Sequence, residues 1–327
     1  MKRWTFTPPN DRVWHGLRSC DITSTESAAL FDMSPYLTKF ELYHRKLGRA
    51  IVEIPSNERM LWGTRLQDVI ARGIADDHGV KVRKLNQYMR VVEARMGSSF
   101  DFEIIGLADN WEGNDTELRR MYREHGVGNF EIKCVDFIIF RDQWTVNDDK
   151  SIEAPAHIEI QVQHQLHVAD RAWAAIGVLV AGHTPKIIIR DRDLEVGQTI
   201  ELRIRELFAM VREGRAPEPS FPDDAELVCK LNGYAEPGRV YDGRADLELI
   251  QLCAQYADGL VREKHAKEDK EVAKAKILQK IGDAERALVP GFNLSASMVD
   301  PAEIPAFTRS GYRNMRITAK KAEKVPA

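Results

Sequence analysis

One pentapeptide, Phe130-Glu131-Ile132-Lys133-Cys134, constrains this chain more than any other feature. Alternate side chains of a β-strand share a face, so Glu131 and Lys133 point one way and the residues between them point into a core. A carboxylate and an ammonium on one face of a buried strand can bind a hard divalent metal ion and activate a water molecule. A surface ion pair would show the same pattern, so other residues of the chain are needed to distinguish a metal site from a surface ion pair.

A second acid comes earlier, in Ser98-Ser99-Phe100-Asp101-Phe102, at the start of a predicted strand. Together with Glu131 and Lys133, Asp101 would complete a set of two carboxylates and one lysine. Such a set suits metal-assisted hydrolysis of a phosphodiester, because Mg²⁺ acidifies the attacking water and stabilises the charge that develops at phosphorus. Asp109 is an alternative for the acid position.

Polar side chains also gather on a predicted helix after the Glu131 strand, in the segment 159–167. Gln163 and His167 are four residues apart and share a helix face. His164 and His167 are three apart, so a metal-binding pair is conceivable, although the glutamate of an H-E-x-x-H motif is absent. The glutamines can hold a water molecule or a phosphate oxygen without adding charge.

The order of predicted elements indicates an α/β (α+β) fold with a mixed sheet flanked by helices. Helical patterns cover 60–78, 156–180 and 200–212, and strand patterns lie between them. The proline-rich stretch 214–222 reads as a linker. We therefore expect one domain over residues 1–222 and a second region over 223–327.

The second region has a long helical pattern over 244–288, with a charge-dense run at 262–280. Alternating charges at helical spacing are typical of a solvated helix or a coiled-coil hairpin. We expect a helical hairpin followed by a short β-like tail, which is locally basic between Arg309 and Lys324.

Composition excludes several classes of protein. A hydrophobic fraction of 43% is enough to build a core, and no window approaches about 18 consecutive apolar residues. The first residues show no apolar signal-peptide region. The four cysteines are scattered without a C-x-x-C pair, so we expect free thiols in a reducing cytoplasm. The net charge of −3 averages opposing regions and does not exclude DNA.

These residues resemble the YqaJ-type viral recombinases, relatives of phage lambda exonuclease within the PD-(D/E)xK nuclease superfamily. The resemblance covers most of residues 12–215 and has six motifs in the family's order. They are 14–18 with 21–26, Ser34-Pro35-Tyr36, Trp62-Gly63-Thr64, 98–101, 131–133 and Gln161-Val162-Gln163.

The resemblance implies a restriction-endonuclease-like core and an Mg²⁺-dependent exonuclease, with Mn²⁺ as an alternative ion. Such an enzyme digests one strand of linear double-stranded DNA from 5′ to 3′. It leaves 3′ single-stranded overhangs for phage or prophage recombination by strand annealing. A single-strand annealing protein and a homotrimeric ring are implied as partners, in the cytoplasm of a bacterial host.

The resemblance also implies residue roles. Asp101, Glu131 and the backbone carbonyl of Ile132 would bind the metal. Lys133 would activate water, and Gln163 would place the water or the scissile phosphate.

A 5′-phosphate site is implied at Arg18, Ser24 and Thr25. A guanidinium, two hydroxyls and a helix start are together suited to bind an anion. One position departs from the family, because Gln67 stands where a glutamate of the acidic cluster is usual. An amide is a weaker metal ligand, so a catalytically weak DNA-binding scaffold is one alternative. An endonuclease on the same core is the other.

Overall fold

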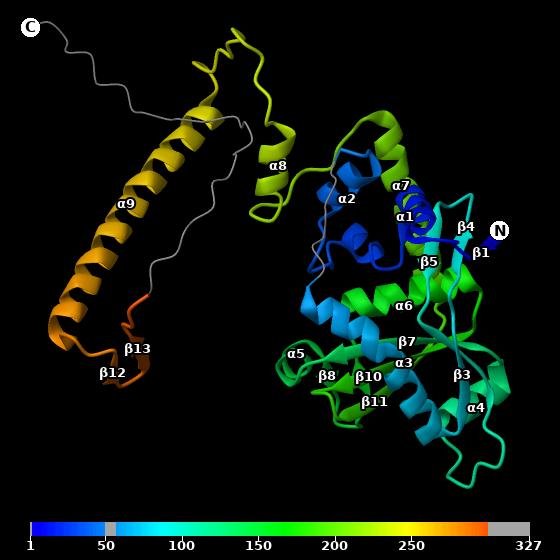
Figure 1. Ribbon diagram of the computed structural model, residues 1–327. Coiled ribbons are helices and arrows are strands. Elements are labelled where there is room, and N and C mark those ends of the chain that lie inside the picture. The colour runs from blue at the N-terminus through cyan, green and yellow to red at the C-terminus, as the bar shows by residue number, and fades with distance from the viewer. Residues whose placement is uncertain (1, 50–56, 300–327) are drawn as a thin grey trace, which may run out of the picture. The chain divides into compact units, whose positions relative to one another are not determined.

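The computed structural model describes residues 2–49 and 57–299. The chain divides into two compact units, residues 1–231 and 232–327, and each is described by itself (Figure 1). The basic tail expected between Arg309 and Lys324 lies outside the described residues.

A mixed five-stranded sheet forms the centre of the first unit, in the order β11-β10-β7-β6-β3 (Figure 1). β7 (Gly128–Val135) pairs parallel with β10 (Trp173–Val180) and antiparallel with β6 (Phe102–Leu107). β11 (Thr184–Asp191) and β3 (Val80–Lys84) add antiparallel edges. The predicted α+β architecture with a mixed central sheet is confirmed.

One face of this sheet packs against α3 (Glu58–His78) and α4 (Glu117–His125). Phe130 and Ile132 of β7 point into this core, together with Trp173 of β10. The alternation predicted for the 130–134 strand therefore holds at Phe130 and Ile132. It is wrong at Cys134, which was also expected in the core and is exposed near the end of β7.

The other face is covered by α6 (Ala156–Ala169), with α5 (Phe137–Gln143) beside it. Val162 and Leu166 of α6 pack on Ile176 of β10, and none of the three is exposed. Ile176 pairs with Glu131 across the parallel ladder. Glu131 therefore faces α6, and that helix supplies its neighbours.

The helix predicted over 156–180 is wrong in its second half. α6 ends at Ala169, because Asp170 adopts a left-handed conformation with φ of 58°. The apolar run that follows forms β10, where residues 173–176 are fully buried between the two helical layers. A continuous apolar run is typical of a central strand buried on both faces, and its periodicity resembles that of a buried helix.

A second, four-stranded sheet has the order β1-β4-β5-β2. Its strands are β1 (Arg3–Phe6), β2 (Ile22–Thr23), β4 (Tyr88–Val91) and β5 (Met96–Ser99). A separate core lies between this sheet and the neighbouring helices. These helices are η1 (Ser27–Phe31), α2 (Lys39–Lys46) and α7 (Leu194–Glu213), and α1 (Asp11–Cys20) leads into β2. The remaining strands, β8 (Thr145–Val146) and β9 (Ile152–Glu153), form a short ribbon.

The first unit ends with α8 (Ala225–Leu231). Asp224, just before this helix, is 1% exposed, and its carboxylate accepts a 2.6 Å hydrogen bond from the Thr38 hydroxyl. The residues after the proline-rich stretch are thus attached to the first unit, beyond the boundary expected at 222.

The second unit contains α9 (Leu247–Ile281) and a hairpin of β12 (Arg286–Val289) and β13 (Phe292–Ser295). α9 is 35 residues long and buries none of them. It is the only helix between residues 232 and 299, so no helical hairpin forms within that described range. In the described parts of the chain, no helix is both long and apolar enough to span a membrane.

Candidate active site

The start of β6 brings Asp101 beside the Glu131 strand. Phe102 pairs with Phe130, so Asp101 lies next to the following residues of β7. One Asp101 oxygen accepts a hydrogen bond from the backbone amide of Ile132 at 2.9 Å. The other accepts one from the Gln67 side chain at 3.0 Å. The distant residues 67, 101 and 131–133 are thus brought together as the sequence predicted.

Glu131 is 5% exposed and has three side-chain donors. Its Oε1 accepts hydrogen bonds from Lys133 Nζ and from the Gln161 amide, both at 2.6 Å. Its Oε2 accepts one from the Gln165 amide at 2.8 Å. Lys133 Nζ also lies 3.3 Å from Gln161 Oε1.

With both carboxylates ionised, two carboxylates and one ammonium leave this cluster with one excess negative charge. Burial, and secondly the charge of Glu131, raise the pKa of Asp101 to about 7, so without a cation this carboxyl ionises only near neutral pH. Burial alone would lower the pKa of Lys133, but the charge and hydrogen bond of Glu131 outweigh it and the pKa is raised. Lys133 is therefore protonated at neutral pH, and the buried carboxylates favour a further cation.

The donor set fits a magnesium ion. Mg²⁺ commonly binds through one or two carboxylates and completes its shell with water and phosphate oxygens. Asp101 and Glu131 supply that number of carboxylates, and Gln67 takes the place of a third. Among residues 2–49 and 57–299, no group of three or more His, Cys, Asp or Glu side chains could hold a metal ion. A site here would therefore depend on two carboxylates and on oxygen donors outside that residue set.

Gln163 does not join the cluster. Its amide donates to the Asp191 carbonyl at 2.8 Å and accepts from the Asp193 amide at 2.9 Å. The glutamines that reach Glu131 are Gln161 and Gln165. They are four residues apart and share a helix face, whereas Gln163 is rotated by about 200° from Gln161.

The other polar residues singled out in the sequence have separate partners. His164 is fully buried with Nε2 at 3.0 Å from the Gly97 carbonyl, and His167 pairs with Glu201 at 3.2 Å. They do not converge as a metal-binding pair. Asp109 bonds Lys81 at 2.7 Å and its side chain is 82% exposed, so Asp101 is the acid of the cluster.

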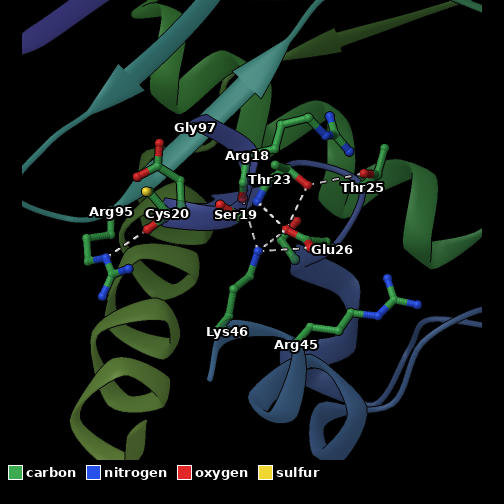
Figure 2. A network of polar contacts seen from close by, with 12 residues as sticks. Arg18, Ser19, Cys20, Thr23, Thr25, Glu26, Arg45, Lys46, Arg95 and Gly97 are labelled. Atoms are coloured by element: carbon green, nitrogen blue, oxygen red, sulfur yellow. Dashed lines mark hydrogen bonds and ion pairs between the residues drawn. The ribbon is translucent and has the colours of Figure 1, made fainter. Parts of the chain in front are cut away.

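Arg18 and Thr25, two of the expected 5′-phosphate residues, lie in one polar region (Figure 2). Arg18, in the last turn of α1, stacks its guanidinium on the Trp14 ring at 4.4 Å. The Trp14 indole N–H donates to the Ser99 hydroxyl at 2.9 Å. The buried Ser24 hydroxyl accepts a hydrogen bond from Ser98 at 2.9 Å. Both contacts lead to β5, which runs directly toward Asp101.

Lys46 holds the backbone of this region together (Figure 2). Its side chain is 3% exposed, and its ammonium bonds the Arg18 carbonyl at 3.2 Å and Glu26 at 2.9 Å. Glu26 in turn accepts hydrogen bonds from the amide and hydroxyl of Thr23, each at 2.9 Å. Burial lowers the pKa of Lys46 despite Glu26. Sequence reasoning missed Lys46, which belongs to no motif. It gave Ser99 no role of its own, although Ser99 lies in the 98–101 motif.

Comparison with known proteins identifies one family. Residues 13–172 match the YqaJ-like viral recombinase domain, as the sequence motifs predicted. No curated protein matches the chain.

Two similar solved structures are of LHK-Exo, an alkaline exonuclease from Laribacter hongkongensis. One is 17% identical with a TM-score of 0.46, and covers 62% of this chain and 94% of its own. The other, with dAMP, is 18% identical with a TM-score of 0.44 and the same coverage. Because both TM-scores are below 0.5, the assignment to a family rests on the match over residues 13–172.

Proposed function

This chain carries a YqaJ-like viral recombinase domain at residues 13–172, and from that premise we propose that it is a metal-dependent DNA exonuclease. The observation that carries the proposal is the buried cluster of Asp101, Glu131 and Lys133. The family match supports a nuclease of recombination. The cluster supports hydrolysis of a phosphodiester with a divalent cation.

Asp101 and Glu131 would hold Mg²⁺, with the backbone carbonyl of Ile132 as a further oxygen donor. When bound, the ion would acidify a water molecule and stabilise charge at phosphorus. Mn²⁺ would fit the same oxygen donors.

The chain's own side chains orient the reactants. Lys133 is held protonated by Glu131, and neutralising Glu131 would lower the pKa of Lys133, because the Glu131 charge is what raises it. Lys133 could then accept a proton from water. Gln161, within reach of both Lys133 and Glu131, is better placed than Gln163 to orient that water or a phosphate oxygen.

Digestion would run from the 5′ end. Arg18, Ser24 and Thr25 would receive the terminal 5′-phosphate, with Ser99 beside Trp14 as a further hydroxyl. Water attacks the next phosphorus and the bond to the 3′ oxygen breaks. The released nucleotide then carries a 3′-hydroxyl, and the shortened strand carries a new 5′-phosphate. The opposite strand is left as a 3′ overhang.

The same reading includes a homotrimer and a single-strand annealing protein in the cytoplasm of a bacterial host. Both partners rest on the family resemblance. Sedimentation of the full chain with and without DNA would measure the trimer, and co-purification with an annealing protein would measure the second partner.

The decisive experiment compares linear and closed-circular duplex DNA with Mg²⁺, and 5′-phosphate with 5′-hydroxyl ends. We expect only linear DNA to be degraded, and faster from a 5′-phosphate. Lys133→Ala should slow digestion about a thousandfold. Lys81→Ala, which changes an exposed lysine paired with Asp109, should not slow it.

Cutting of the circle would instead establish an endonuclease. Retained binding without any digestion would establish a scaffold, which the amide at Gln67 keeps as the second candidate. Equal digestion of both end types would overturn the 5′-phosphate site.

A further inference from the structure

The long helix of the second unit carries an apolar stripe that stays exposed to water. In the first half of α9 this stripe consists of Leu249, Cys253, Tyr256 and Leu260, which are spaced four, three and four residues apart. Such spacing places the four side chains on one face of the helix. No residue of α9 is buried, and the exposed fractions of Leu249, Tyr256 and Leu260 are 37%, 39% and 44%. Covering this face would be favourable.

The stripe returns near the end of α9. Leu278 follows Leu260 after about five helical turns, so it lies on the same face. It is 44% exposed. Each apolar end of the helix borders a hollow within the second unit. Cys253 lines one hollow with Tyr241, and Leu278 lines the other with Leu294. The helix therefore offers two apolar surfaces, one near each end.

Charged residues occupy the same stripe between its apolar ends. Glu263 and Lys267 continue the spacing of three and four residues after Leu260. Within the described part of the chain neither forms an ion pair, although the adjacent Arg262 pairs with Asp258 at 3.0 Å. Charges in the middle of an apolar stripe can determine the direction and register in which two helices pair.

The two halves of α9 also differ in charge. Residues 246–261 contain three acidic and no basic side chains, whereas residues 262–281 contain seven basic and four acidic side chains. A second copy of the helix running antiparallel would place each half against the half of opposite charge. A parallel copy in register would place like charges together, Glu263 against Glu263 and Lys267 against Lys267. Charge complementarity therefore favours the antiparallel arrangement.

We propose that α9 pairs antiparallel with α9 of a second copy of this chain, centred near position 265. In that register Glu263 faces Lys267 of the second copy, and two-fold symmetry makes this contact twice. Cys253 lies opposite Leu278 of the second copy, so the two apolar surfaces cover each other. The proposal goes beyond the proposed nuclease function. The contact is separate from the proposed ring, and it would join two chains or two rings.

The first test is disulfide cross-linking of the full chain by a mild oxidant, without DNA or metal. In the Leu278→Cys variant, we expect a disulfide between the new thiol and Cys253 of another copy, identified by mass spectrometry of the linked peptides. Within one α9 these two positions are about 37 Å apart, so one chain cannot form this bridge by itself. In the wild type, Cys253 should not link to Cys253 of a second copy.

Val272→Cys is the matched control for this cross-link. Val272 is 53% exposed. It is rotated by about 120° around the helix from Leu278, so its side chain lies outside the proposed contact. The Val272→Cys variant should therefore lose the cross-link to Cys253 under the same conditions.

The second test reverses charges at the centre of the pair. Glu263→Lys and Lys267→Glu each place like charges opposite each other, and we expect either change to raise the dissociation constant about tenfold. Combining them restores opposite charges and should restore the affinity. Lys276→Glu, which reverses an exposed charge on the opposite face of α9, is the control and should leave the affinity unchanged. Sedimentation equilibrium of the full chain over a range of concentrations measures all four variants.

Four results would overturn the antiparallel pair. A disulfide between two Cys253 residues in the wild type would show a parallel arrangement. Equal cross-linking of Leu278→Cys and Val272→Cys, or none in either, would remove the proposed register. A double charge variant that associates no better than the single variants would exclude the central contact. A mass of one copy at every concentration would leave residues 300–327 as the cover of the stripe. Neither test depends on digestion, so failure of the nuclease proposal would not change these results.

Discussion

Two buried glutamates lie on the same face of the five-stranded sheet. One belongs to an ion-pair cluster outside the candidate active site, and the other belongs to that site. Glu103 on β6 and Glu131 on β7 are 1% and 5% exposed. Glu103 bonds two arginines, Arg83 at 3.0 Å and Arg171 at 2.8 Å, so its cluster carries one excess positive charge. Glu131 bonds one lysine and two neutral amides and lies next to Asp101, so its cluster carries one excess negative charge when Asp101 is ionised.

This difference in net charge determines whether each cluster can bind a further cation. Two guanidiniums more than neutralise the carboxylate between them, so that carboxylate attracts no further cation and its role is structural. A pair of carboxylates with one lysine still attracts a cation. Each prediction below changes one of these clusters and asks whether activity and stability respond separately.

The largest effect should come from the Glu131 cluster. Lys133→Ala is expected to slow digestion of linear duplex about a thousandfold, within the range for loss of a group that transfers a proton. Asp101→Ala and Glu131→Ala should be as severe, because each removes a metal ligand. The measurement is the single-turnover rate with Mg²⁺ in excess.

Arg171→Ala is the matched change in the Glu103 cluster, and its activity per folded molecule should equal that of the wild type. Wild-type rates in folded Lys133→Ala would show that the two clusters do not differ in chemistry.

Glu103→Ala should reverse the pattern. Removing the shared partner of Arg83 and Arg171 is expected to lower the free energy of unfolding by about 2 kcal/mol. This is below the usual range for breaking a buried ion pair, because the Arg83 side chain is 62% exposed. Urea unfolding measures it, and Glu131→Gln should lose less than half as much. An equal loss in both variants would remove the distinction between the clusters.

The two glutamine positions on α6 sharpen the boundary of the Glu131 cluster. Gln161→Leu is expected to slow digestion about 30-fold, because one hydrogen bond to a charged group contributes about 2 kcal/mol. Gln163→Leu should leave the rate per folded molecule near that of wild type and lower stability by about 1 kcal/mol. Rates and urea midpoints of both variants decide this, and a slower Gln163→Leu enzyme would return the role to that residue.

Gln67→Glu should increase the difference in charge between the Glu103 and Glu131 clusters. A third carboxylate beside Asp101 would increase the negative charge, and we expect the Mg²⁺ concentration for half-maximal digestion to fall about tenfold. Gln67→Met, which adds no charge, is the control. An unchanged Mg²⁺ requirement in Gln67→Glu would show that this position does not contact the metal.

The smallest effect concerns pH without metal. The pKa of Asp101 is raised above 3.8, so its contribution to stability is fully present below that pH and is lost as pH rises through the raised pKa. Asp101→Asn removes this contribution. Between pH 3.8 and about 7, the free energy of unfolding of Asp101→Asn in EDTA should therefore fall less steeply than that of the wild type. Parallel curves for the two proteins would show that the pKa of Asp101 is not raised in the folded chain.

Sequence predicted the parts of the site that depend on local pattern. Strand alternation correctly placed Glu131 and Lys133 on one face, opposite Ile132. The motifs also indicated that Asp101 and Gln67 would meet them. The motif did not indicate which glutamines of α6 face Glu131. The packing of Val162 and Leu166 on β10 determines this and directs Gln161 and Gln165 toward Glu131.

Other features depend on contacts between distant segments. The apolar run 173–180 has the composition of a buried helix or of a central strand, and only pairing with β7 and β11 decides for the strand. Nothing in the immediate sequence of Lys46 or Glu103 predicts that either side chain is buried.

The segment 98–101 carries a consequence for how the chain can vary in length. Ser98 contacts Ser24, Ser99 contacts Trp14 below Arg18, and Asp101 contacts Ile132. Only Phe100 separates Ser99 at the end of β5 from Asp101 just before β6. Inserting or deleting one residue here would turn side chains to the wrong face and move one anchor relative to the other. This stretch should therefore tolerate no indels, and a scan of single-residue insertions would find it far less permissive than the loop at 108–116.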